Sequence, residues 1–106
     1  MVKVVWTSLA RQDAESIFRY YNTLSHAFAE SLMRELLDTS KRLQPMPEMG
    51  PKEPLLEQYH RNYRYVLVHH RYKLIYLFEN QICSILMVWD CRQDPKLLEQ
   101  NDRFVS

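Results

Sequence analysis

The first half of the chain opens with a short apolar segment, followed by apolar residues at helical spacing. Val2–Trp6 is rich in β-branched and aromatic residues, which predicts a strand. Thr7 or Ser8 can cap a following helix. Apolar residues then recur every three or four positions, and the charged residues between them, Asp13 included, are expected to point away from that face. The predicted apolar face comprises Ala10, Ala14, Ile17, Phe18 and Tyr21.

A second helix is predicted over residues 26–43, after the polar link 22–25 that offers a new cap. So short a link favours an antiparallel pair of helices. Four of the five prolines and the only glycine lie in the segment 45–54, so the helix must end near Gln44. Its apolar positions are Ala29, Leu32, Met33, Leu36, Leu37 and Leu43.

The second half of the chain carries three β-rich runs at 63–69, 72–78 and 81–89, with a tight turn predicted at Glu79–Asn80. Connections this short allow only antiparallel hairpins. The third run is apolar on both faces and is expected to be the most buried strand. Before these runs, Leu55, Leu56 and Tyr59 give a weak signal for a strand or a helical turn.

These elements predict an α+β fold of order β-α-α-β-β-β, in which a helical hairpin packs on one face of an antiparallel sheet. At 106 residues, the chain is expected to form a single domain over residues 1–106. A net charge of +1 argues against broad nucleic-acid binding, although a local basic patch is compatible with it. Neither a spanning segment nor a signal peptide is visible, so we expect a cytoplasmic protein with no membrane partner.

The cysteines and histidines give no metal-site pattern. Cys83 and Cys91 lie eight positions apart along a predicted strand, roughly 26 Å in extended backbone, which is too far for a disulfide. We expect free thiols and no metal ion. His60, His69 and His70 could supply a general base, although surface histidines without a role are commoner.

The segment 89–95 carries the most unusual chemistry, because polar residues follow directly on a buried strand. The planar fork of Arg92 is suited to a phosphate or a carboxylate. The alternative is that Arg92 pairs with Asp90 or Asp94 and only fixes the strand exit.

The predicted hairpin region combines cations with aromatic rings, a mixture that suits single-stranded nucleic acid. Tyrosines at alternate strand positions are more often half-buried packing residues. Period-two alternation places Tyr72, Leu74 and Tyr76 on one face and Lys73 on the other. The cations are Arg61, Arg64, Arg71 and Lys73, and the rings are Tyr59, Tyr63, Tyr65, Tyr72 and Tyr76.

Several motifs, in order, resemble the RelE/ParE superfamily of bacterial type II toxins, from about Val2 to Leu98. They are the opening 4–10, Tyr20-Tyr21, the pattern Leu43-x-x-x-Pro47-x-x-Gly50, Tyr63-Arg64, the strand 72–76 and the closing 85–95. The resemblance implies the same β-α-α-β-β-β fold and a toxin that a cognate antitoxin neutralises. No cofactor or metal is implied.

The resemblance implies one of two targets. RelE-like members cleave messenger RNA on the ribosome, and ParE-like members inhibit DNA gyrase without known catalysis. In the first case Lys73 and Arg92 match the family's catalytic cations, with Arg64 as a third candidate. Lysine at position 73 lacks the arginine fork, and the tail after Arg92 lacks the tyrosine or histidine that nucleases often carry there. His60, His69 or Glu57 would have to substitute.

A third hypothesis is a binding module that has lost toxicity and only pairs with an antitoxin. In every case the antitoxin is expected to lay a helix or strand over apolar surface near the helical hairpin and the sheet edge. We expect its contacting segment to be acidic or amphipathic, because the sheet region has an excess of Arg and Lys. The helical hairpin and the terminal segment are the candidate surfaces for gyrase.

Overall fold

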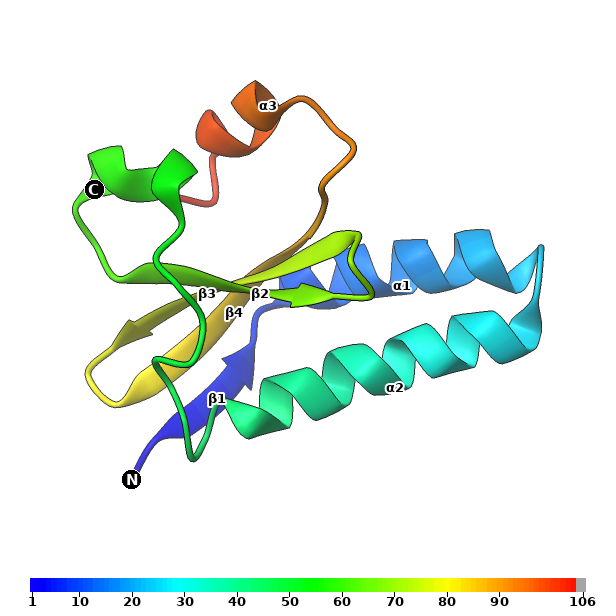
Figure 1. Cartoon of the computed structure of the whole chain (residues 1–106), viewed down its shortest axis with the longest axis horizontal. Helices are drawn as coiled ribbons and strands as arrows, with labels where there is room; N and C mark the ends of the chain where they lie inside the picture. Colours follow the sequence, from blue (N-terminus) through cyan, green and yellow to red (C-terminus); the bar gives the residue numbers. More distant parts are fainter. Residues whose placement is uncertain (105–106) are drawn as a thin grey trace.

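The computed structural model describes residues 1–104 and has the predicted element order (Figure 1). A 3₁₀ helix, η1, precedes the C-terminal strands, and a short helix, α3, follows them. Within the described residues, no helix is long and apolar enough to cross a bilayer. The elements are β1 (Lys3–Trp6), α1 (Ser8–Asn22), α2 (His26–Arg42), η1 (Pro54–Tyr59), β2 (Tyr63–Val68), β3 (Tyr72–Glu79), β4 (Ile82–Asp90) and α3 (Pro95–Glu99).

The two long helices begin at the predicted polar caps. Thr7 Oγ1 accepts a hydrogen bond from the Ala10 amide, and Ser25 Oγ accepts one from the Phe28 amide. Each helix buries its predicted apolar face, and α1 and α2 lie side by side as a hairpin (Figure 1). Leu37 is an exception, since its side chain remains 48% exposed.

The sheet has the order β1-β4-β3-β2. The pairs β2–β3 and β3–β4 are antiparallel, as predicted from their short connections. The sheet is mixed, however, because β1 pairs in parallel with β4. The helical hairpin carries the chain back across the sheet, which makes this parallel pairing possible. β4 therefore lies inside the sheet, consistent with its apolar character on both faces.

Both β-hairpins turn through two residues with positive φ, the conformation of a type I′ turn. His69 and His70 form the first turn, at φ 55° and 53°, and the Arg71 amide donates to the Val68 carbonyl. The second turn uses Asn80 and Gln81. The prediction of Glu79–Asn80 was one residue too early, because Glu79 still pairs with Ile82 in the β3–β4 ladder.

The sheet buries side chains on both faces. Tyr72, Leu74 and Tyr76 share one face, as period-two alternation predicted, and the helical hairpin covers that face. The other face was not predicted to be covered, yet η1 and α3 lie over it (Figure 1), and Phe104 packs with them. Their cluster includes Leu56, Tyr63, Ile75, Met87, Trp89, Leu98 and Phe104. Local periodicity did not reveal this layer because η1 and α3 are short.

The proline-rich loop joins the helical hairpin to the sheet at Gly50. The Tyr76 hydroxyl accepts a hydrogen bond from the Gly50 amide and donates one to the Pro47 carbonyl. A Cβ on Gly50 would lie 2.2 Å from the Tyr65 carbonyl oxygen. The backbone approaches this closely only because position 50 has no side chain. Burial raises the pKa of Tyr76, which remains a neutral hydroxyl.

Candidate functional site

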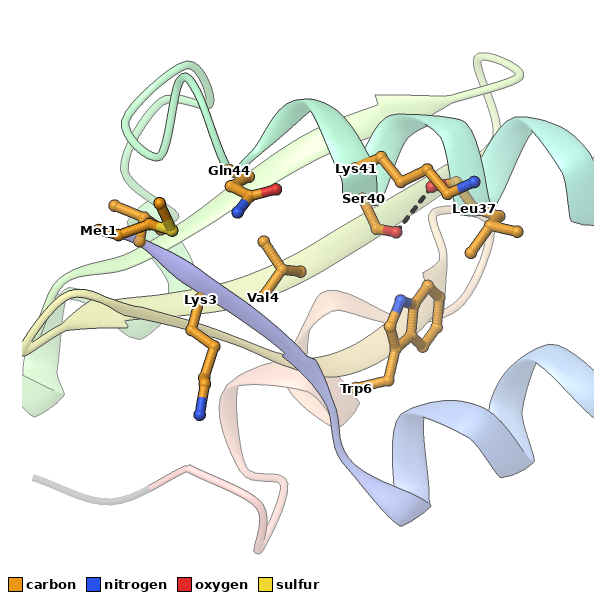
Figure 2. A pocket seen from close by; sticks show the side chains of 9 residues that line it. Met1, Lys3, Val4, Trp6, Leu37, Ser40, Lys41 and Gln44 are labelled. Carbon is orange, nitrogen blue, oxygen red and sulfur yellow. Dashed lines mark hydrogen bonds between the residues drawn. The ribbon is translucent and has the colours of Figure 1, made fainter.

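A groove of about 630 Å³ runs between β1 and α2 (Figure 2). Figure 2 shows Val4 and Trp6 of β1 on the side of α2, and Lys3 on the other side of the strand. From α2, Leu37 and Ser40 face the same groove, and the Ser40 hydroxyl donates to the Leu37 carbonyl at 2.7 Å. The remaining lining residues are Met1, Val2, Lys41 and Gln44.

One side of this groove is an unpaired sheet edge. β1 is an end strand, and the Lys3 and Thr7 amides donate to the carbonyls of Gln81, just before β4, and of Ile85 in β4. Backbone groups alternate along a strand, so the Val4 and Trp6 amides and carbonyls point outward, away from β4. An exposed edge of this kind is able to pair with a strand of another chain.

The groove also contains a donor without an acceptor. Trp6 Nε1 is buried and has no hydrogen-bond partner among residues 1–104. The indole nitrogen can only donate, and leaving such a group unpaired costs about 1–3 kcal/mol. Lys41 supplies the cation of the lining, whereas the Lys3 side chain lies on the opposite side of β1. The groove therefore suits an extended segment with apolar and acidic side chains.

Lys73 lies on the face of the sheet that η1 and α3 cover. Its Nζ lies 2.6 Å from Glu53 Oε1, and the Glu53 side chain is fully buried. The ammonium also sits 4.4 Å from the centre of the Tyr65 ring. Glu53 further accepts from the Leu55 amide, which caps η1. Lys73 thus neutralises a buried carboxylate that fixes the start of η1.

Arg64 lies on the opposite face, where its side chain ties β2 to the proline-rich loop. Its Nη1 donates to the Gly50 carbonyl at 2.8 Å, its Nη2 to Glu48 at 3.0 Å and its Nε to Asn62 at 2.9 Å. The side chain is only 15% exposed. These contacts give Arg64 a role in holding the loop.

Arg92 follows β4 and remains exposed, with 62% of its side chain accessible. Its Nη2 lies 2.7 Å from Asp90 Oδ2, and its Nε and backbone amide also donate to that carboxylate. These hydrogen bonds hold the pKa of Asp90 below its usual range. Of the two readings of this segment, the pair with Asp90 is present, and it leaves Nη1 open to solvent.

The structure does not gather the three candidate catalytic cations. Lys73 and Arg64 occupy opposite faces of the sheet, and Arg92 lies at the end of β4 beside α1. The histidines are divided as well. His60 ends η1, whereas His69 and His70 form the turn after β2, which is six residues or about 20 Å long.

Glu57 and His60 do come together. They line a cleft of about 470 Å³ with Lys52, Glu53 and Arg61. Arg61 is paired with Glu79, and this hydrogen bond lowers the pKa of the Glu79 carboxyl. The cleft therefore combines a carboxylate, an imidazole and cations. No group of side chains with the composition of a metal site occurs within residues 1–104.

The tyrosines of the sheet are mainly packing residues, as their alternation favoured. Tyr63, Tyr72 and Tyr76 are buried, and Tyr59 and Tyr65 are partly buried. The cysteines are free, as predicted, with Cys83 buried in β4 and Cys91 exposed after it. Burial raises the pKa of both thiols.

One structural ion pair was not predicted from the sequence. Asp13 was expected to point away from the apolar face of α1, but it packs against β4. Its carboxylate accepts from the Val88 amide at 3.0 Å and from both terminal nitrogens of Arg103, while Arg103 Nη1 also donates to the Leu86 carbonyl. The pair thereby supplies hydrogen-bond partners for the backbone of β4 beyond the end of β1. Since 90 positions separate the two residues, no local pattern reveals the contact.

Comparison with known proteins gives a consistent assignment. The family model described as the ParE toxin of the type II toxin–antitoxin system parDE matches residues 4–95. A search of curated proteins finds no match.

A solved structure described as the chromosomal ParDE toxin–antitoxin system from P. aeruginosa is similar in fold. The TM-score is 0.71 at 18% sequence identity, and the match covers 85% of this chain and 96% of that one. The family match spans most of the 106 residues and includes every element from β1 to β4. The chain therefore belongs to the ParE toxin family of type II toxin–antitoxin systems, within the RelE/ParE superfamily that its motifs indicated.

Proposed function

We propose that this toxin arrests growth by binding DNA gyrase through a protein interface, without catalysing RNA cleavage. One observation carries the proposal: the cations that RNA cleavage needs are dispersed and engaged. Lys73 is paired with the buried Glu53, and Arg64 holds the loop on the other face. A cleavage site has to bring a base and cations to one phosphate. The family match, to a ParE model, agrees with a gyrase-directed toxin acting in the cytoplasm.

The antitoxin is proposed to occupy the β1–α2 groove. Its backbone would pair with the open edge of β1. Lys41 favours an acidic or amphipathic segment. The half-exposed Leu37 offers an apolar contact in the same groove.

Expression in bacteria distinguishes the hypotheses. A gyrase-directed toxin should induce the SOS response and leave messenger RNA intact. Sequencing of RNA ends, in the same cultures, would reveal codon-periodic cuts if the protein cleaved RNA on the ribosome. Harmless expression of the unmodified chain would instead favour a module that only binds an antitoxin.

Ribosome-dependent cleavage remains the second candidate, on the observation that Glu57 and His60 line one cleft with two cations. It predicts that Glu57→Ala or His60→Ala abolishes both growth arrest and RNA cuts. If both variants arrest growth as the parent does, this cleft has no catalytic part in toxicity.

A further inference from the structure

A polar cleft of about 380 Å³ lies between α1 and the adjoining ends of β3 and β4. It shares no lining residue with the β1–α2 groove. Two buried tyrosines form its floor, since Tyr21 is 8% exposed and Tyr72 is 3% exposed. The other lining residues are Asp13, Ser16, Ile17, Tyr20, Val88, Asp90, Arg92 and Gln93.

The tyrosine pair has two hydroxyl protons, and only one of them is used in a hydrogen bond among residues 1–104. Their oxygens are 3.1 Å apart, and Arg71 Nη1 donates to the Tyr21 oxygen at 2.6 Å. One of the two protons fills the bond between the hydroxyls. Tyr72 is the donor in that bond, so the Tyr21 hydroxyl proton has no acceptor among residues 1–104. The bonds from Tyr72 and Arg71 also lower the pKa of Tyr21, which makes its hydroxyl a better donor.

Arg92 supplies a second free donor at the rim. Asp90 binds its Nε and Nη2, so the guanidinium is already fixed in one orientation. Nη1 makes no hydrogen bond within the described part of the chain, and 62% of the Arg92 side chain is exposed. A side chain held in this way loses little entropy when a ligand binds.

The charged side chains in and beside the cleft leave one positive charge without an opposite charge, so the cleft suits a ligand with a single negative charge. Arg103 neutralises Asp13, and Arg92 neutralises Asp90, which leaves Arg71 as the uncompensated charge beside the floor. A carboxylate carries one charge and accepts two or more hydrogen bonds. A nucleic-acid strand presents successive phosphates and is favoured by a basic tract, which two rim aspartates do not provide.

We infer that this α1–β4 cleft receives an Asp or Glu side chain from the protein target of the toxin. The inference rests on the proposed gyrase-binding function for the identity of that target. The carboxylate itself would accept from Arg92 Nη1 and from the tyrosine pair, with Arg71 balancing its charge.

The carboxylate site can be tested without the target. Acetate is titrated into the ¹⁵N-labelled protein at constant ionic strength, and the Arg92 Nε–H and Gln93 amide signals are followed by NMR. Saturable shifts that disappear in Arg92→Ala are expected. An absence of saturation would overturn the inference. Tighter binding of inorganic phosphate than of acetate at the same signals would also overturn it, in favour of a phosphate ligand.

Binding to purified gyrase tests the assignment of the target. Arg92→Ala and Tyr21→Phe are each expected to weaken binding at least about tenfold, the usual effect of losing a hydrogen bond to a charged group. Tyr21→Phe keeps the ring that packs on Phe28. The matched control is Arg19→Ala, which removes an exposed arginine of α1 whose polar contacts among residues 1–104 are with Ser16 and Glu15.

The outcomes separate the two proposals. If the parent protein binds gyrase and both cleft variants bind it as tightly as the Arg19→Ala control does, the inference is wrong and the function stands. If acetate saturates the cleft but the parent protein does not bind gyrase, the proposed function is wrong and the carboxylate site stands without its target.

Discussion

At the scale of single residues, the charged side chains that resemble catalytic groups have structural partners. Lys73 shows this most clearly, because its ammonium contacts a carboxylate with no exposed side-chain surface. A buried charge that loses its partner is costly, whereas replacing both partners with neutral groups is often tolerated. Stability measurements can therefore separate a structural role for Lys73 from a catalytic one.

We predict that Lys73→Met lowers the free energy of unfolding by about 3–5 kcal/mol, since it leaves Glu53 buried and unpaired. The double variant Lys73→Met/Glu53→Gln should recover most of that loss and should still arrest growth. Chemical denaturation measures the first effect. Arg61→Ala is the control, because its pair with Glu79 is about one-third exposed and should contribute less than about 1 kcal/mol. A stable double variant without toxicity would contradict the structural role.

Asp90 provides a pH-dependent prediction. Its pKa is lowered in the folded protein by the hydrogen bonds from Arg92, so this contact stabilises the fold above the unfolded-state pKa of about 4. The stabilisation is lost as the pH falls through the lower, folded-state pKa. An NMR titration of the Asp90 carboxyl should give a midpoint below its ordinary value, and that midpoint should rise in Arg92→Ala. An unchanged midpoint would show that Arg92 does not hold this carboxylate in solution.

At the scale of elements, local patterns predicted the helical hairpin and the three C-terminal strands well. Caps, apolar periodicity and two-residue turns depend on neighbours in sequence, so Ser25 or Asn80 can be interpreted directly. The parallel pairing of β1 and the layer formed by η1 and α3 depend on distant contacts. For the same reason the sequence did not show that Lys73 faces Glu53, or that Asp13 binds Arg103.

The Asp13–Arg103 pair is expected to protect the exposed edge of β4. Asp13→Ala removes the acceptor of the Val88 amide and leaves Arg103 without its ion pair. We predict at least a tenfold faster hydrogen exchange at Val88 and a loss of roughly 2 kcal/mol in stability. Glu15→Ala, an exposed change on the same helix, is the control. Equal exchange at Val88 in both variants would show that the edge does not need this pair.

The β1–α2 groove makes a prediction for the antitoxin. Leu37→Asp puts a negative charge on the apolar wall of the groove and should weaken antitoxin binding at least tenfold. The new carboxylate would repel an acidic segment, and an apolar segment would have to pack against a charge. Leu37 is 48% exposed, so the fold should tolerate the change. Calorimetry with the antitoxin measures the change in binding affinity. Leu24→Asp, at an exposed position between the helices, is the control, and an equal loss in both variants would exclude the groove.

At the scale of the whole molecule, the β1–α2 groove and the α1–β4 cleft lie on different elements and share no residue. The proposed antitoxin site and the proposed target site are therefore separate surfaces. The overall charge of +1 is consistent with a protein target, since ribosome-directed and nucleic-acid-binding proteins usually carry a basic excess.

The most direct test is a supercoiling assay with purified gyrase, relaxed plasmid, ATP and the purified toxin, in the absence of ribosomes. We predict that supercoiling is inhibited as the toxin approaches the concentration of gyrase, and that added antitoxin reverses the inhibition. Unaffected supercoiling, together with messenger RNA cut by the same preparation on translating ribosomes, would contradict it.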